Sequence, residues 1–490
     1  MASPNSTGAV FAQVKATATE NRLRDLWHRK KQLLSFHTLL TKNVGEVTQA
    51  LSTDDAISQS EAQRVLAVTL LEITTHYDSL NLKKELKSEY RVKWGKDNED
   101  RRIRAPLVYI SSCDFNLFYS VLSALSAATA AGSCCLIKLE NSLQTSPALL
   151  RKYLAQVYDP EAVGITTTTP DASILAQCLV VDQTGELKDA PGNRRFKALT
   201  SSPHPMAVAV VDRTADIGAA ARGLAQSRLL FAGRSTQAID LVLVNDFVAD
   251  DLAARLAEEL ARQSGGKQGV VDNSAGHKKS PHQEKARLGG EPNGSSNDGG
   301  RGQTLYEVAG VSVVKIGADR KIRDKKTAPG VIALSTITSL DDAIDRLEDQ
   351  GVQLNTLYLF AKLNEARYLS QFISTDVTIV NHIPLSYLVG PAAPWGCAVS
   401  CRTRYSRAMF EIPSPQFVSS SGKEEEEGSA SRLLEEASGP LKPTRQPEGG
   451  AMGFFDVAVG VGALVYLLPS VALTLGAVSV AAYKAYGMFG

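Results

Sequence analysis

The sequence has almost no excess of charge of either sign. Its 53 lysines and arginines stand against 52 aspartates and glutamates, which leaves a formal net charge of +1 over 490 residues. Nucleic acids and strongly acidic surfaces are attracted by a concentrated field of one sign. The near balance argues against charge-driven binding, and we expect no nucleic acid among the partners.

Cysteine is scarce, and the start of the chain lacks the apolar core of a secretory signal. The six cysteines lie in or beside apolar stretches, without the spacing of a disulfide framework or a zinc site. These absences predict a reducing compartment, synthesis completed in the cytosol and no bound metal. The six are Cys113, Cys134, Cys135, Cys178, Cys397 and Cys401.

One long segment lacks charge altogether. Residues 457–482 form an uncharged run of 26 residues, flanked by aromatic and charged residues. At a rise of about 1.5 Å per residue, a helix of this length exceeds the roughly 30 Å of a hydrocarbon core. We predict a single-pass transmembrane helix, a membrane anchor over residues 454–483, with the main domain in the cytosol and the lipid bilayer as a partner. A hairpin within one leaflet, turning near Pro469, is the alternative.

Two other segments lack core-forming residues. Residues 265–302 are rich in glycine, serine and asparagine, with too little apolar surface to offset the entropy of ordering. They predict a disordered surface insertion. Residues 419–450 contain four consecutive glutamates and three prolines, which predict a flexible linker between domain and membrane.

The rest of the chain alternates between helical spacing and short apolar runs. Helical spacing predicts helices over residues 10–51, 58–82, 115–131, 215–230, 340–349 and 365–373. Apolar runs predict buried strands over residues 105–111, 133–138, 179–182, 206–212, 238–244, 330–336, 354–360 and 377–380. The fold class is therefore α/β, with a Rossmann-type doubly wound domain and a second α/β lobe.

Six segments in order resemble the aldehyde dehydrogenases over about residues 11–418. They begin at Ala105, Leu136, Val211, Phe231, Ser339 and Leu357. The first, Ala105-Pro-Leu-Val-Tyr-Ile-Ser-Ser-Cys-Asp-Phe-Asn, is similar to a family segment that ends in Pro-Trp-Asn-Tyr-Pro. The apolar tail makes the membrane-anchored fatty aldehyde dehydrogenases the most similar type.

The resemblance implies a domain division and a partner. N-terminal helices and a dinucleotide-binding-like domain occupy residues 1–205, and a catalytic-like lobe occupies residues 206–385. An oligomerisation-like segment follows over residues 386–418. The family uses this segment for subunit pairing, so the resemblance implies a homodimer.

The resemblance also places the family's catalytic roles on residues of another kind. The nucleophilic cysteine falls on Thr236, and the general base glutamate falls on Ser202, with His204 nearby in a proline-flanked turn. The oxyanion asparagine falls on Asp114, whose charge would repel the intermediate. A threonine hydroxyl without a base is a weak nucleophile, and Cys113 is the alternative thiol.

The cofactor positions are partly replaced as well. Lys138 matches the lysine that binds the adenosine ribose, but Asn141 stands in place of the glutamate three residues later, and Glu140 is the partial substitute. The phosphate turn falls on residues 181–187, where Gly185 is retained and Asp182 would face phosphate with like charge.

The last cofactor contact is lost, because Lys326-Thr-Ala replaces the Glu-Ile-Phe segment that holds the nicotinamide ribose. NAD or NADP is the implied cofactor, with few of its contacts kept. The combined losses favour a membrane-anchored, catalytically impaired or repurposed member of the superfamily. The alternative is an active NAD(P)-dependent oxidoreductase acting on a lipophilic aldehyde.

Overall fold

The computed structural model divides the chain into two units, Met1–Gln416 and Phe417–Gly490. It describes residues 7–94, 101–142, 144–187, 191–193, 195–202, 205–265, 271–272, 303–317, 326–348, 354–397, 400 and 402–414, with residues 434–435, 437–440, 457, 460–462, 464–465, 469 and 476 in the second unit. The predicted insertion, linker and anchor lie almost wholly outside these residues. Among the residues described, no helix is both long and apolar enough to cross a membrane.

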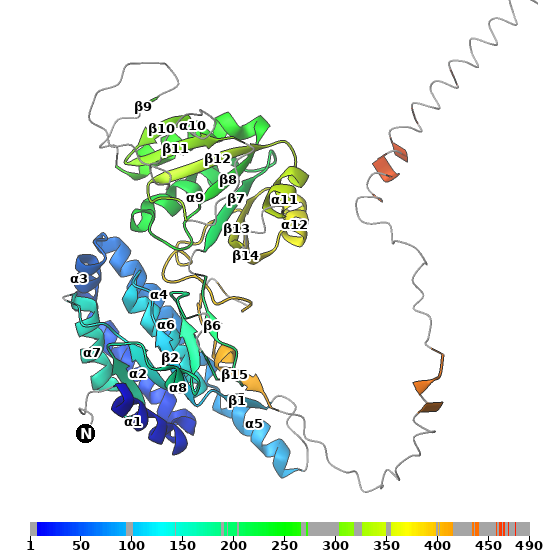
Figure 1. Cartoon of the computed structure of the whole chain (residues 1–490). Coiled ribbons are helices and arrows are strands. Elements are labelled where there is room, and N and C mark those ends of the chain that lie inside the picture. Colours follow the sequence, from blue (N-terminus) through cyan, green and yellow to red (C-terminus); the bar gives the residue numbers. More distant parts are fainter. Residues whose placement is uncertain are drawn as a thin grey trace, which may run out of the picture. The chain divides into compact units, whose positions relative to one another are not determined.

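A five-stranded parallel sheet forms the centre of the first lobe, in the order β4-β3-β2-β5-β6. Its strands β2 and β6 are labelled in Figure 1. The strand order reverses beside β2, so this sheet is doubly wound, as predicted. The predicted βαβ unit is confirmed as β2, α6 (Leu117–Ala131) and β3. The strands are β2 Leu107–Ser111, β3 Cys134–Lys138, β4 Val163–Thr166, β5 Leu179–Asp182 and β6 Leu199–Thr200.

The helices before this sheet differ from the prediction in number. The single helical stretch predicted over residues 10–51 was wrong, because the chain forms α1 (Thr7–Thr19), α2 (Leu26–Lys42) and α3 (Val44–Asp54) there. Asn21 breaks the run in a left-handed conformation, and the Asp25 side chain then caps α2 by accepting the N–H of Trp27.

The next helix begins where a capping box predicts a start. The Ser58 side chain and the Glu61 side chain each accept a hydrogen bond from the other residue's backbone N–H, and α4 runs from Gln59 to Ser79. Three further helices of this lobe were missed by the sequence analysis. They are α5 Leu82–Lys93, α7 Thr145–Val157 and the short α8 Ala172–Leu175.

The second lobe contains an eight-stranded sheet in the order β14-β13-β7-β8-β12-β11-β10-β9. Its strands are parallel from β14 to β11, and β10 and β9 add an antiparallel edge that the sequence analysis missed. The strands are β7 Met206–Val211, β8 Leu241–Asn245, β9 Val271–Asp272, β10 Gln303–Val308, β11 Val311–Ile316, β12 Val331–Ile337, β13 Leu354–Phe360 and β14 Thr375–Val380.

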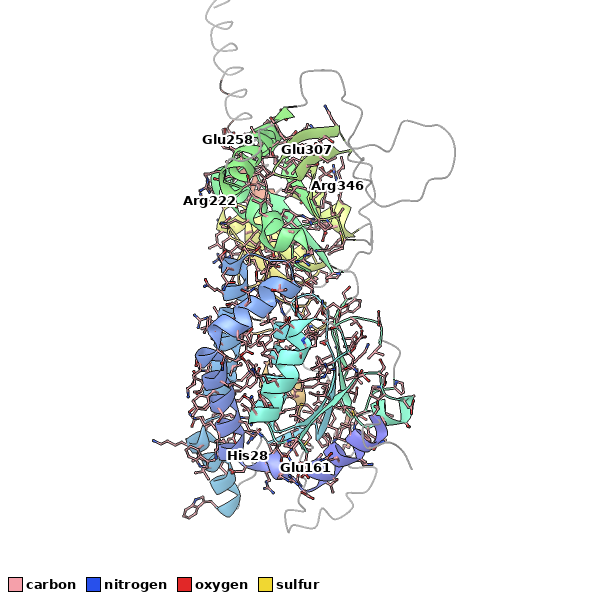
Figure 2. The ribbon with its side chains drawn as sticks, turned by 90° about the vertical axis from the view of Figure 1, so that its left-hand side faces the viewer. His28, Glu161, Arg222, Glu258, Glu307 and Arg346 are labelled. Atoms are coloured by element: carbon pink, nitrogen blue, oxygen red, sulfur yellow. The ribbon has the colours of Figure 1, made fainter. Side chains whose placement is uncertain are left out.

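Helices cover both faces of this second sheet. Val208 of β7 packs in the cluster that contains α11 (Leu340–Glu348) and α12 (Leu363–Phe372). The next residue, Ala209, packs in the cluster that contains α9 (Ile217–Leu229) and α10 (Ala249–Gln263). This alternation is what a strand buried on both faces requires. The residues labelled in Figure 2 mark the two lobes: Arg222, Glu258, Glu307 and Arg346 in the second, His28 and Glu161 in the first.

The end of the first unit returns to the first lobe. The strand β15 (Glu411–Pro413), which follows the 3-10 turn Arg407–Phe410, pairs with β1 (Arg102–Arg104). His76 of α4 fixes this return, because one ring nitrogen lies 2.8 Å from the Ser126 hydroxyl and the other 2.8 Å from the Tyr405 carbonyl oxygen. The carbonyl can only accept, so neutral His76 donates to Tyr405 and accepts from Ser126.

Burial lowers the pKa of His76 to about 4, whereas an unfolded histidine titrates near 6.5. The unfolded state therefore binds the proton first, and the stability contributed by neutral His76 is lost as the pH falls through this interval. We expect the free energy of unfolding of the wild type, relative to His76→Gln, to fall by about 2 kcal/mol between pH 7 and pH 5. Urea unfolding at several pH values measures this difference.

The pH dependence of the wild type is compared with that of His76→Gln because a second buried group changes the free energy of unfolding with pH in the opposite direction. Burial raises the pKa of Glu72 to about 7, so its contribution is lost as the pH rises. An exposed histidine, changed in His382→Gln, serves as the control and should leave the pH dependence unchanged. A pH dependence that is the same with and without His76 would contradict the assignment.

Candidate active site

The carboxyl ends of the five-stranded sheet bring together the predicted cofactor residues. Ser111, the last residue of β2, is paired in register with Lys138 of β3 on one side and Asp182 of β5 on the other. The Lys138 ammonium group lies 3.1 Å from the carboxylate of Glu140, whose side chain is exposed. A doubly wound sheet binds its ligands at this edge, beside the reversal of strand order.

The carboxylate of Asp182 occupies the centre of the predicted phosphate turn. Asp182 is fully buried, and one of its oxygens accepts the N–H of Thr184 at 3.0 Å, the N–H of Gly185 at 3.0 Å and the Thr184 hydroxyl at 2.7 Å. The other oxygen accepts the N–H of Leu187 at 2.8 Å. A phosphate-binding turn offers such N–H groups to an anionic ligand. Here an internal carboxylate accepts them.

The segment after this turn also differs from a dinucleotide-binding site. A pyrophosphate is normally held at the N-terminus of the helix that follows the turn. Between β5 and β6 the described residues, 183–187, 191–193 and 195–198, form turns and loops without a helix. The predicted glycine, Gly185, has φ +72°, so it serves the turn that folds around Asp182.

The loop after β2 holds Cys113 and Asp114. Its position is fixed by Gln183, whose side chain accepts the N–H of Cys113 at 3.1 Å and donates to the Ser120 carbonyl oxygen at 2.8 Å. Burial, with a smaller effect of the Asp114 charge, raises the pKa of the Cys113 thiol. The Asp114 side chain is exposed. This environment opposes formation of the thiolate that a nucleophilic cysteine needs.

The Thr236 hydroxyl is engaged with the backbone of another segment. It donates to the Gly390 carbonyl oxygen at 3.0 Å, while the neighbouring Ser235 hydroxyl donates to the Leu388 carbonyl oxygen at 2.7 Å. Gly390 has φ +84°, and a Cβ atom there would collide with the ring of Tyr119 on α6. Since a carbonyl oxygen cannot remove a proton, Thr236 has no base in this contact.

The predicted position of the general base lies beside the same segment. Ser202 is half-buried directly after Ser201, whose hydroxyl donates to the Ala392 carbonyl oxygen at 2.8 Å. Residues 388–392 therefore contact both the Thr236 loop and the start of the Ser202 turn. His204 lies outside the described residues.

The sequence analysis missed a buried ion cluster centred on Asp240. Its carboxylate accepts the Lys326 ammonium group at 2.8 Å, the N–H of Ala207 at 2.9 Å and the N–H of Thr327 at 2.9 Å. The guanidinium of Arg228 lies 3.6 Å away, and both Arg228 and Asp240 are buried. A carboxylate just before the apolar run of β8 was the only signal of this cluster in the sequence.

This cluster also holds the side chain of Lys326 in place. The ammonium group also donates to the carbonyl oxygens of Thr236 at 2.8 Å and Ala238 at 2.7 Å. All three N–H bonds of a lysine are thus used inside the protein, where the family places a ribose contact. Burial lowers the pKa of Lys326, and the Asp240 charge opposes this shift.

Removing the charge of Asp240 should leave the buried Arg228 and the partly buried Lys326 without their carboxylate partner. We expect Asp240→Asn to lower the free energy of unfolding by about 3–5 kcal/mol, because breaking a buried ion pair leaves an uncompensated charge. Denaturant unfolding of the purified protein measures the change. Adding Lys326→Met should recover part of the loss, since it removes one stranded cation.

The matched control is Asp345→Asn, at an exposed position of α11, which should change the stability by less than about 0.5 kcal/mol. Equal stability of the Asp240→Asn and Asp345→Asn variants would show that the cluster contributes nothing.

The described residues contain no group of three or more histidine, cysteine, aspartate or glutamate side chains that could hold a metal ion. The candidate site thus consists of a turn folded around Asp182, a thiol whose pKa is raised by burial, an engaged threonine hydroxyl and an ion cluster around Asp240. None of these supplies an activated nucleophile or a free row of N–H donors.

Comparison with known proteins gives structural neighbours only; no family model and no curated protein matches the sequence. The AldH protein of Staphylococcus aureus, solved with substrate bound, has 17% identity and a TM-score of 0.62, covering 88% of this chain and 100% of that one. An NADP-dependent glyceraldehyde-3-phosphate dehydrogenase from Bacillus halodurans, complexed with NADP, has 13% identity and a TM-score of 0.56, covering 76% and 82%.

An NAD-dependent benzaldehyde dehydrogenase from Corynebacterium glutamicum has 14% identity and a TM-score of 0.55, covering 76% of this chain and 85% of that one. The likeness extends over nearly the full length of these neighbours. At such identities it speaks for the arrangement of the chain and not for the activity. This chain has the fold of the aldehyde dehydrogenases.

Proposed function

We propose that this protein is a membrane-anchored member of the aldehyde dehydrogenase superfamily that no longer oxidises aldehydes and serves as a non-catalytic scaffold at the cytosolic face of a membrane. The observation that carries the proposal is the Asp182 carboxylate, which accepts the N–H groups of its own turn. A fold that binds NAD(P) needs those donors for the cofactor's phosphates.

Electrostatics strengthens this argument. A pyrophosphate placed at the turn would meet a buried carboxylate at close range, where the low dielectric makes repulsion between like charges large. It would also have to replace four hydrogen bonds that Asp182 already receives. Lys138 is the one predicted cofactor contact with a positive charge, and it is paired with Glu140.

The catalytic positions point the same way. Thr236 donates its proton to a carbonyl oxygen, and Lys326 is bound inside the ion cluster. The alternative function, an NAD(P)-dependent oxidation of a lipophilic aldehyde, requires Cys113 as the nucleophile. The raised pKa of that thiol keeps its reactive form rare near neutral pH. The alternative function is supported by the structural neighbours, which are NADP-dependent and NAD-dependent enzymes.

The membrane part of the proposal rests on the sequence. Residues 457–482 are long enough and apolar enough for a tilted helix across a bilayer, and a glutamate- and proline-containing linker precedes them. The basic side chains before the run favour an orientation with the folded domain on the cytosolic side. The membrane-anchored fatty aldehyde dehydrogenases share this combination of fold and tail.

The first test is cofactor binding to the full chain in detergent. We expect millimolar NAD or NADP to leave the melting temperature unchanged, because the phosphate turn is occupied by Asp182. A cofactor at 100 times its dissociation constant would add about 2.7 kcal/mol to the stability of the folded state, an increase that thermal unfolding detects.

An active aldehyde dehydrogenase measured in parallel provides the positive control. A rise in melting temperature with either cofactor would overturn the non-catalytic assignment. In that case a comparison of Cys113→Ala with Thr236→Ala, using a long-chain aldehyde, identifies the nucleophile.

The second test concerns the tail. We expect the full chain to remain in the membrane fraction after extraction with high salt and alkaline carbonate, because an apolar helix is held by the hydrophobic effect and not by charge. A chain that ends at residue 418 should appear in the supernatant. A full chain released by salt alone would refute the anchor, and deletion of residues 265–302 is the control for an effect of shortening.

A further inference from the structure

A cavity of about 600 Å³ lies at the opposite edge of the five-stranded sheet from the candidate active site. Its lining includes Pro106, just before β2, Ala131, the last residue of α6, and Phe196, three residues before β6. These positions mark the amino ends of the strands. The cavity is therefore separate from the crevice of Asp182 and Cys113, which lies at the carboxyl ends.

The lining is strongly positive, although the whole chain has a net charge of only +1. Six arginines and two glutamates line the cavity, an excess of four positive charges. The arginines are Arg24, Arg29, Arg102, Arg104, Arg195 and Arg407. They come from the loop before α2, from α2 itself, from β1, from the loop before β6 and from the turn before β15. Segments distant in sequence thus converge on one space with the same charge.

The two glutamates are already engaged with two of the arginines. The Arg407 guanidinium donates to Glu85 at 2.7 Å and to Glu411 at 2.7 Å, and Arg29 lies 3.6 Å from Glu85. Arg104 donates to the neutral side-chain oxygen of Asn21 at 2.7 Å. The other three arginines of the lining, Arg24, Arg102 and Arg195, form no ion pair within the described part of the chain. Four guanidinium groups therefore lack a carboxylate partner there.

The inner wall of the cavity is held rigidly. Arg29 is 5% exposed and donates to the Ala130 carbonyl oxygen at 2.6 Å, at the end of α6. Gly132 follows with φ +89°, and a Cβ atom there would lie 3.0 Å from the Arg104 guanidinium. Glycine leaves room for this arginine. Burial lowers the pKa of Arg29 and of Arg104. The Glu85 charge opposes the shift of Arg29, while the charges of Arg407 and Arg104 add to it, and the Arg24 charge adds to the shift of Arg104. A bound anion would relieve this repulsion.

We propose that this cavity binds a ligand that carries a phosphate monoester group. The planar guanidinium group presents paired N–H donors that match the oxygens of phosphate, and several arginines around one space suit a dianion better than a single carboxylate. The volume lies within the range of small-molecule sites and exceeds that of one phosphate. Ile103 and the buried Phe196 offer apolar contacts for the carbon part of the ligand.

This ligand chemistry has two sources, a soluble phosphorylated metabolite or the headgroup of phosphatidic acid. The proposal does not depend on the loss of dehydrogenase activity, because the two sites lie at opposite edges of the sheet. Two probes separate the sources for the full chain in detergent or on vesicles. Glycerol 3-phosphate is titrated by calorimetry, and sedimentation is compared for phosphatidylcholine vesicles with and without phosphatidic acid.

The test variant combines Arg102→Gln with Arg195→Gln. Both side chains are exposed and have no ion pair in the described residues, so the fold should be preserved. We expect at least a tenfold weaker binding of the phosphate monoester probe, because two charge-assisted contacts are lost. Arg195→Lys keeps the charge without the planar pair of donors, and its affinity should lie between those of the wild type and the double variant.

The matched control combines Arg222→Gln with Arg367→Gln, which removes the same charge from exposed positions on α9 and α12 (Arg222 is labelled in Figure 2). Its affinity should equal that of the wild type. Binding of glycerol 3-phosphate alone assigns a soluble ligand, and binding only to vesicles with phosphatidic acid assigns a headgroup. No saturable binding of either probe at millimolar concentration, or equal losses in the two double variants, overturns the proposal.

Discussion

The buried carboxylate of Asp240 is the contact on which the second lobe depends. It joins the start of β8, the backbone of β7 at Ala207 and the Lys326 segment, and it lies beside the buried Arg228 of α9. Two cations and two N–H groups share one buried anion, so removing the carboxylate would leave both cations without their partner. This arrangement fixes the loop that carries Thr236, because Lys326 also binds the Thr236 carbonyl oxygen.

Asp182 has a comparable role in the first lobe, because its carboxylate fixes the turn that follows β5. Each aspartate is buried and each accepts backbone N–H groups, Asp182 from its own turn and Asp240 from residues 207 and 327. In a cofactor-binding protein, such N–H donors have no partner within the protein. The cost of removing them from water is offset only when the ligand accepts their hydrogen bonds. Here they are satisfied when the chain folds. The proposed loss of affinity for an anionic cofactor rests on this arrangement of the N–H donors.

The sequence predicted the strands that are short apolar runs, and missed several helices, the half-exposed strands and the contacts between distant residues. Every predicted strand is present, and all except the half-exposed edge strand β14 are largely buried. The strands β10 and β11 and the pair β1 and β15 were missed. The exposed and half-exposed residues of β1, β10 and β15 give only a weak alternation. Asp182 was singled out from the sequence as a like charge for phosphate, which stays a prediction. Its partners within the turn, and the link between Asp240 and Lys326, 86 residues apart in sequence, required coordinates.

The charged groups at one edge of the first sheet are paired, and those at the other edge are largely unpaired. At the carboxyl edge, Lys138 is paired with Glu140 and the turn donors are paired with Asp182. At the amino edge, the cavity keeps four positive charges in excess. Like charges without partners repel each other and lower the stability of the folded protein, unless a bound anion neutralises them. A chain balanced to a net charge of +1 has carboxylates enough to neutralise these arginines, yet they are placed elsewhere. This uneven distribution favours an anionic partner at the amino edge over the cofactor site that the fold would suggest.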